Sequence, residues 1–134
     1  MAHKGKLLVV DDELSVRDLF QSFFTEEGYE VLLAEGGQDA LVTLKLHDID
    51  VIFIDLKLFG MNGIELCRQI RKTKPISMIY AMTGWSALFE IEECREAGFD
   101  DYFEKPLDME KLLLLVEQAF ERLERWKKRY SKPS

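Results

Sequence analysis

Apolar runs and amphipathic segments alternate five times along this chain. The runs 6–10, 30–34, 50–54, 76–82 and 100–103 are short and mostly apolar, as in strands that are buried on both faces. The segments after them have a helical period and predict helices over about 13–27, 37–47, 63–73 and 86–97, and a last one from near Asp108. Strands that alternate with helices indicate right-handed βαβ units and a parallel sheet. We therefore expect an α/β, doubly wound fold.

Individual residues indicate which face of each predicted helix is buried and where some of the helices begin or end. The first helix should bury one apolar face, because its side chains repeat with helical spacing: Val16, Leu19, Phe20, Phe23 and Phe24. Gly28 follows at a position where glycine commonly ends a helix. Asp108 is suited to cap the last helix. The residues expected to point inward from the second and third helices are Ala40, Leu41, Leu44, Ile64, Cys67 and Ile70.

Composition places the chain among single globular domains. Its 134 residues are 47% hydrophobic and 32% charged, enough for a normal core. No apolar run approaches the ~18 residues of a membrane span, and we find no signal-peptide pattern before the first strand. The net charge of -7 argues against general binding of nucleic acid. Cys67 and Cys94 lie in helical patterns typical of buried thiols, so we expect a cytoplasmic protein.

Polar residues of related chemistry follow the predicted strands. Asp11 and Asp12 come after the first strand and Asp55 after the third, while Thr83 and Lys105 follow the fourth and the fifth. Because parallel strands present their carboxyl ends at one edge of the sheet, these side chains should converge. Carboxylates in one pocket raise one another's pKa, and a divalent cation relieves that conflict. Oxygen ligands alone favour Mg²⁺, and a carboxylate can itself be a nucleophile that forms an aspartyl-phosphate.

Five motifs in this order resemble those of the receiver domains of two-component response regulators. They are Val9-Val10-Asp11-Asp12-Glu13, the strand that ends at Asp55, Met61-Asn62-Gly63, Met82-Thr83-Gly84 and Lys105-Pro106. The resemblance covers residues 5–122. It implies a flavodoxin-like (βα)5 fold, with a five-stranded parallel sheet in the order 2-1-3-4-5. It also implies a signalling switch that is activated by phosphorylation.

The resemblance further implies how the acids would be used. Asp55 would be the phosphoacceptor and would take the phosphoryl group from a sensor histidine kinase or a histidine phosphotransfer protein. Asp12 would be a direct ligand of Mg²⁺, and Asp11 would act largely through water. Asp55 and the backbone carbonyl of Lys57 would complete the protein's part of the metal site.

The remaining motif residues would hold the phosphoryl group and report its presence. Thr83 and Lys105 would each contact a phosphoryl oxygen, and Tyr102 would rotate inward on activation. The readout would be the face formed by the fourth helix, the fifth strand and the fifth helix. The Lys105–Pro106 peptide bond should be cis. We expect no turnover of an external substrate, only self-catalysed phosphorylation and slow dephosphorylation.

Three residues near Asp55 depart from the family pattern. Phe59 stands where a Met-Pro pair is usual, as part of Leu58-Phe59, and should be an exposed apolar side chain. Lys57 and Trp85 occupy the two positions that tune phosphoryl lifetime in the family. A second ammonium and a large indole at these positions lead to the hypothesis that self-dephosphorylation is slow.

The last helix has an apolar stripe that runs beyond the predicted domain. Its members are Met109, Leu112, Val116, Ala119, Leu123, Trp126 and Tyr130. Residues 123–134 would then form a helical extension, which either pairs with a second chain to make a homodimer, or leads to an output domain, or remains a solvated tail. The bases that follow Glu121 suit the C-terminus of a helix and are weak evidence for nucleic acid.

Three other classes of protein remain alternatives. A pseudo-receiver would bind partners without phosphorylation, although the intact set of acids argues against it. A phosphatase with an aspartate nucleophile usually has a second acid two residues on, where this chain has Lys57. A flavin-binding protein of the same topology would need a phosphate loop rich in Ser, Thr and Gly after the first strand, and we find none.

Overall fold

Five parallel strands form one sheet in the computed structural model, which describes residues 3–84 and 88–131. The strands are β1 (Lys6–Val10), β2 (Glu30–Ala34), β3 (Val51–Asp55), β4 (Met78–Thr83) and β5 (Asp101–Glu104). Their order is β2-β1-β3-β4-β5, and every neighbouring pair is parallel. This order confirms the predicted flavodoxin-like, doubly wound α/β fold.

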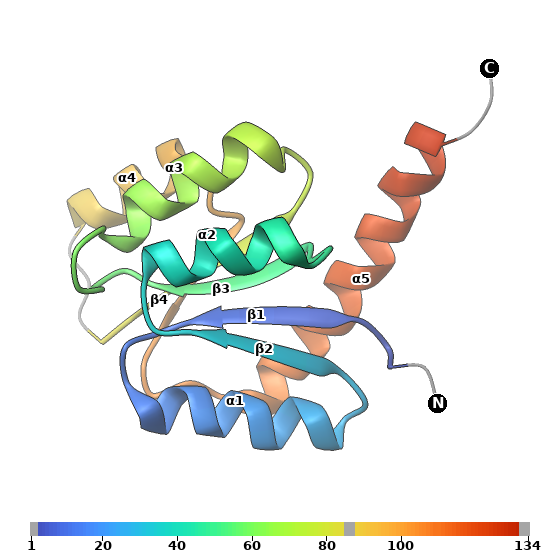
Figure 1. Ribbon diagram of the computed structural model, residues 1–134, viewed down its shortest axis with the longest axis horizontal. Helices are drawn as coiled ribbons and strands as arrows, with labels where there is room; N and C mark the ends of the chain where they lie inside the picture. Colours follow the sequence, from blue (N-terminus) through green and yellow to red (C-terminus); the bar gives the residue numbers. More distant parts are fainter. Residues whose placement is uncertain (1–2, 85–87, 132–134) are drawn as a thin grey trace.

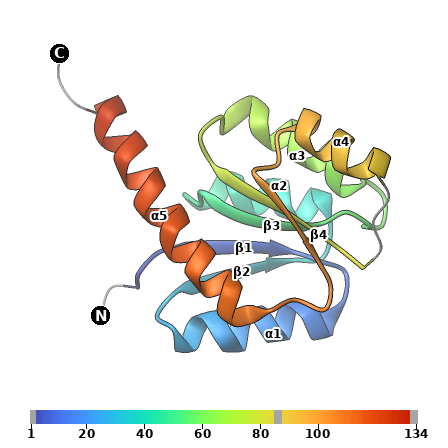
Figure 2. The ribbon, with the colours of Figure 1, turned by 180° about the vertical axis from the view of Figure 1, so that it is seen from behind.

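Helices cover both faces of the sheet (Figure 1). They are α1 (Leu14–Glu26), α2 (Gly37–Leu46), α3 (Gly63–Thr73), α4 (Leu88–Ala97) and α5 (Met109–Ser131). The helices α1 and α5 lie on one face and α2, α3 and α4 on the other, as Figure 2 shows from behind. Alternate strand residues serve the two layers: Leu7 and Val9 pack with α1 and α5, whereas Leu8 and Val10 pack under α2, α3 and α4.

One predicted core residue of α1 is wrong. Leu19 is 44% exposed, while Phe20 and Phe24 of the same helix are fully buried. The apolar stripe of α1 is wider than the surface it covers, so the residue at the edge of the stripe faces solvent. Arg17, by contrast, is buried on this helix. The predicted thiols behave as expected: Cys67 and Cys94 are free and buried.

Local signals in the sequence fix where helices begin and end. Gly28 has a φ of 98°, which glycine adopts without strain, and it ends α1 as predicted. The predicted cap at Asp108 is also present, because its side chain accepts a hydrogen bond from the Lys111 amide at 3.3 Å. Asn62 caps α3 in the same way by accepting from Glu65 at 2.9 Å. Asn62 thereby anchors the loop that follows β3.

The long helix α5 stays in contact with the domain beyond residue 122. Leu123 is buried in the same apolar layer as Leu112 and Val116. One turn further on, Nζ of Lys127 lies 2.7 Å from a carboxylate oxygen of Asp50, the residue that precedes β3. Within the parts of the chain that the structure describes, no helix combines the length and apolar character that crossing a membrane requires.

Asp50 is the centre of a small polar cluster at the amino ends of the strands. It accepts hydrogen bonds from Nζ of Lys74 at 3.1 Å and Oγ of Ser77 at 2.9 Å, in addition to its contact with Lys127. Burial alone would raise the pKa of Asp50, but the bonds from Lys127 and Ser77 outweigh burial and hold this pKa below its usual value. The cluster therefore links α5 to the ends of β3 and β4 that lie away from Asp55.

Candidate functional site

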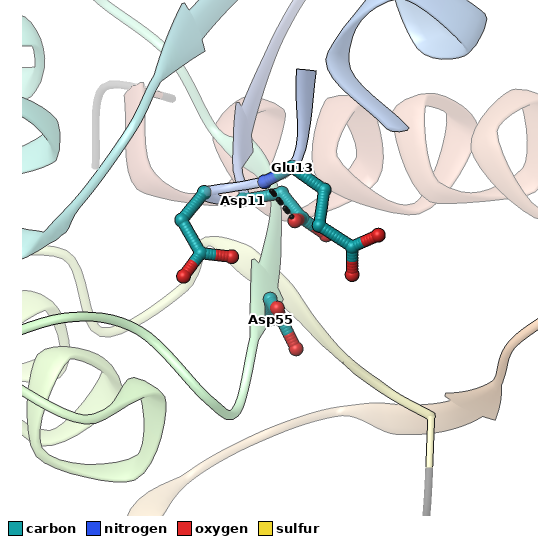
Figure 3. A group of neighbouring side chains, drawn as sticks. Asp11, Glu13 and Asp55 are labelled. Atoms are coloured by element: carbon teal, nitrogen blue, oxygen red, sulfur yellow. Dashed lines mark hydrogen bonds between the residues drawn. The ribbon is translucent and has the colours of Figure 1, made fainter. Parts of the chain in front are cut away.

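Acidic side chains gather where β1 and β3 end, at the carboxyl edge of the sheet. Asp55 is the last residue of β3, and Asp11, Asp12 and Glu13 follow β1 directly. One carboxylate oxygen from each of these four residues lies within 4.8 Å of the others. Figure 3 shows Asp11 and Glu13 facing Asp55 across the pocket. The predicted convergence of strand-end acids is therefore present, and Glu13 joins it.

Two of the four acids are buried and two are exposed. Asp11 is fully buried and Asp55 is 4% exposed, whereas Asp12 and Glu13 are exposed. The side chain of Asp11 accepts a hydrogen bond from the Glu13 amide at 2.9 Å. The side chain of Asp55 accepts from the Lys57 amide at 3.3 Å. The residues that line the pocket, which has a volume of about 290 Å³, are Asp12, Glu13, Asp55, Lys57, Gly84 and Lys105.

Lys105 brings an ammonium group into the same pocket. Its Nζ lies 2.9 Å from Asp11, 3.1 Å from Glu13 and 3.5 Å from Asp55. Burial would lower the pKa of Lys105, but its contacts with Asp11 and then Asp55 and Glu13 raise this pKa well above the usual value. The ammonium is therefore always charged at neutral pH and is held mainly by Asp11. The Lys105–Pro106 peptide bond is cis, as expected.

The charge of the pocket suits a divalent cation. Burial first, and then the charge of Asp11, raise the pKa of Asp55 to about 6 against the opposing effect of Lys105. Oδ2 of Asp11 is buried, and its close neighbour is the Lys105 ammonium at 2.9 Å, which offsets part of the negative charge of the acids. Four carboxylates against one ammonium group leave a net negative charge, and they form an oxygen-rich set of the kind that Mg²⁺ prefers.

The predicted switch residues lie on β4 and β5. Thr83 is the last residue of β4 and is buried, and its carbonyl accepts a hydrogen bond from the Lys105 amide at 2.7 Å. Tyr102 of β5 is half-buried, and its hydroxyl oxygen is buried with no hydrogen-bond partner among residues 3–84 and 88–131. Phe59 is 88% exposed, as expected. Trp85 lies outside the residues that the structure describes.

Sequence reasoning missed two residues at this site, Glu13 and Arg17. The signal for Glu13 was its position, because it directly follows the two acids Asp11 and Asp12 at the end of the first strand. Arg17 stands on α1 three residues before Phe20, so its spacing places a charged side chain on the apolar face of the helix. A charge at such a position is a signal, because burying it demands partners.

Comparison with known proteins identifies the family. The profile of the response regulator receiver domain matches residues 7–117. The chain therefore belongs to the receiver domain family of response regulators. Members of this family are phosphorylation-activated signalling switches that interact with histidine kinases or phosphotransfer proteins, and they generally bind Mg²⁺ at an acidic pocket.

Individual relatives agree with this assignment. The chain is 36% identical over 107 residues to the uncharacterized transcriptional regulatory protein YrkP of Bacillus subtilis (strain 168), covering 80% of this chain and 46% of that protein. It is 32% identical over 107 residues to sporulation initiation phosphotransferase F of the same organism, covering 80% and 86%. A CheY-like receiver domain protein from Methanospirillum hungatei JF-1 superposes with a TM-score of 0.86 at 27% identity, covering 90% of this chain and 97% of the other. The chain spans about half the length of several curated relatives.

Proposed function

We propose that Asp55 accepts a phosphoryl group from the phosphohistidine of a partner kinase or phosphotransfer protein, in a reaction that depends on Mg²⁺. The observation that carries this proposal is the position of Asp55. The Asp55 side chain is 6% exposed in a pocket of about 290 Å³, among other acids, with an ammonium group 3.5 Å away. A buried carboxylate that is open to solvent on one side can attack a phosphorus atom brought to the mouth of the pocket.

The residues around Asp55 would have different roles in the phosphoryl transfer. An Oδ atom of Asp55 attacks phosphorus, the P–N bond to the donor imidazole breaks, and the released nitrogen takes up a proton from water. Lys105 neutralises one phosphoryl oxygen and the Thr83 hydroxyl donates to another. Asp11, Asp12, Asp55 and the carbonyl of Lys57 would hold Mg²⁺, which supplies positive charge to the phosphoryl oxygens. Because the pKa of Asp55 is about 6, the attacking carboxylate is mostly ionised at neutral pH.

The conformational change caused by phosphorylation would be transmitted to the face formed by α4, β5 and α5. The Thr83 carbonyl and the Lys105 amide share a hydrogen bond of 2.7 Å, so a shift of either phosphoryl contact would move the ends of β4 and β5 together. Tyr102 of β5 packs against the core layer that includes Cys94 and Ala97 of α4, and its buried hydroxyl lacks a partner in the described part of the chain. A side chain with an unsatisfied polar atom gains by moving, which supports Tyr102 as the residue that reports on Asp55.

Acetyl phosphate tests the proposed reaction without a partner protein. With Mg²⁺ present, we expect the intact mass to rise by about 80 Da, the mass of one phosphoryl group on the aspartate. Chelation of Mg²⁺ by EDTA should remove the adduct. If no adduct forms in Mg²⁺, the chain is a pseudo-receiver that acts through binding alone.

The phosphoryl group on Asp55 should persist for minutes or longer in the isolated protein. Lys57 lines the pocket beside Asp55, where its ammonium can hold a phosphoryl oxygen. Lys57→Met should therefore shorten the lifetime severalfold, whereas Lys72→Met, a change at an exposed lysine of α3, should leave it unchanged. The lifetime is measured by the loss of the mass adduct after acetyl phosphate is removed. Decay of the wild-type adduct within seconds would refute slow dephosphorylation.

We also propose that the extended α5 mediates a homodimer that forms on phosphorylation. Exposed bases follow one another on the last turns of α5, at Arg122, Arg125, Lys128 and Arg129, while α4 exposes Glu92 and Glu96. Trp126 between these bases is 50% exposed. Opposite charges on α4 and α5 favour pairing of α4 of one copy with α5 of another.

Sedimentation velocity with and without beryllofluoride, a phosphoryl mimic, tests the dimer. We expect a monomer without the mimic and a dimer with it, and the dimer should weaken as salt concentration rises. Trp126→Ser should weaken it as well. A monomer under every condition would favour α5 as a linker to an output domain instead, which would fit with relatives that are about twice as long as this chain.

A further inference from the structure

Arg17 is a buried charge that the proposed reaction does not use. Its side chain lies on α1 and the residue is 9% exposed. A guanidinium group removed from water requires hydrogen-bond partners. The structure gives it two: Nη1 donates to the backbone carbonyl of Asp11 at 2.8 Å, and Nη2 lies 3.5 Å from Oε1 of the exposed Glu35 after β2. The shorter bond leads directly to the acidic pocket.

The Asp11 carbonyl belongs to the peptide unit that joins Asp11 to Asp12. Holding this carbonyl therefore fixes the plane of that peptide and the direction in which Asp12 leaves the chain. The rest of Asp11 is held as well, because its amide donates to the Ala34 carbonyl at 3.1 Å and its Oδ1 accepts from Glu13 at 2.9 Å. No hydrogen bond within residues 3–84 and 88–131 holds the Asp12 carboxylate. The direction in which the Asp12 carboxylate points therefore depends on the orientation of its backbone.

We infer that Arg17 is a positioning residue for the cation site: it orients the Asp11–Asp12 peptide so that both carboxylates face the same cation. This inference rests on the proposed Mg²⁺ dependence. Arg17 touches neither the cation nor the phosphoryl group. It acts through the backbone, as residues behind metal ligands commonly do, and their loss typically weakens metal binding by 10- to 100-fold.

Charge and geometry must be separated in the test, because they act in opposite directions. A guanidinium near the pocket repels a divalent cation, so its removal alone would strengthen binding. Glu35 offsets part of that repulsion. Arg17→Lys keeps the positive charge but loses the planar fork that reaches the carbonyl and Glu35 together. A change in the Mg²⁺ affinity of this variant would therefore report a change in the orientation of the Asp11–Asp12 peptide and not a change in charge.

Titration calorimetry of the full chain with Mg²⁺ provides the main readout. We expect Arg17→Lys to raise the dissociation constant about tenfold. Arg68→Lys, a matched change at an exposed arginine of α3, should leave it unchanged. The rate of phosphorylation by acetyl phosphate should require about tenfold more Mg²⁺ for half-saturation in Arg17→Lys, yet approach the wild-type rate when Mg²⁺ saturates.

The outcomes distinguish this inference from the proposed function. If wild type binds Mg²⁺ and Arg17→Lys binds it equally well, even with a lower melting temperature, Arg17 only supports the fold and the inference fails. If Arg17→Lys lowers the saturated rate and leaves the half-saturating Mg²⁺ unchanged, the inference also fails. If wild type itself binds no Mg²⁺, both the inference and the metal dependence of the proposed function fall together.

Discussion

Asp55→Asn is expected to abolish the phosphoryl adduct and at the same time to make the protein more stable. The first effect follows because an amide is not a nucleophile toward phosphorus at neutral pH. The second follows from the pocket. Burial and the charge of Asp11 raise the pKa of Asp55 to about 6, while an aspartate in an unfolded chain has a pKa of about 3.9. Neutral asparagine has nearly the same shape without the buried charge.

The pH dependence of this stabilisation has a definite sign. Between about pH 4 and 6 the folded protein keeps a proton on Asp55 that the unfolded chain has released, so stability falls as pH rises through this window. Above about pH 6 the penalty is nearly complete and amounts to roughly 3 kcal/mol. Asp55→Asn should therefore exceed wild type by roughly this amount at neutral pH, and by almost nothing below about pH 4.

Urea unfolding in EDTA, followed across this pH range, measures the difference. Asp18→Asn, at an exposed acid of α1, is the control and should track wild type. Adding Mg²⁺ should stabilise wild type more than Asp55→Asn, because the variant lacks one of the carboxylates that we propose to hold the cation. An adduct that survives in Asp55→Asn, or a variant less stable than wild type in EDTA at neutral pH, would contradict the assignment.

Gly63→Ala should destabilise the protein by about 3 kcal/mol and slow phosphorylation at least tenfold. Gly63 is the first residue of α3 and packs directly behind Asp55. A Cβ atom there would overlap the backbone oxygen of Asp55 and lie 2.8 Å from Cα of Leu56. Backbone atoms cannot move aside as the end of a side chain can, so α3 and the end of β3 must separate. That separation would displace Asp55 from Lys105.

Thermal unfolding and the rate of adduct formation report the two effects. The melting temperature of Gly63→Ala should fall by roughly 10 °C. Gly36→Ala is the matched control, because its Cβ would have nothing closer than the Phe59 carbonyl at 3.9 Å and its φ of -159° suits any residue. Gly36→Ala should change stability by less than about 1 kcal/mol. Equal behaviour of the two variants would show that the space behind Asp55 is not limiting.

The positions of Asp55, Thr83 and Lys105 could be predicted because each follows or ends a strand that is recognisable in the sequence. A continuous apolar run marks the strand, and parallel strands leave no freedom in where their carboxyl ends meet. The strand ends shift by only one residue in the structure, so that Asp55 and Thr83 are themselves the last residues of β3 and β4.

Contacts that depend on how a helix is rotated or where it reaches could not be predicted in the same way. Leu19 fits the apolar stripe of α1 but lies at its exposed edge, while Arg17 is a charged residue at a buried position of the helix, and the sequence does not show that its partner is the carbonyl of Asp11. A hydrophobic period gives the face of a helix only to within about one residue on either side. The pairing of Lys127 with Asp50 joins residues far apart in the chain, and no local pattern encodes it.

This pairing limits how α5 can move. The helix is fixed to the sheet along the buried side chains Leu112, Val116 and Leu123, and again at Lys127 by Asp50. Because α5 is held at several points along its length, it cannot rotate away from the sheet about one of them. Motion that begins at β5 can therefore reach the exposed side of α5 only as a twist about the helix axis or a slide along it. A partner bound near Trp126 would sense Asp55 through the angle of that side chain and not through its distance from the domain.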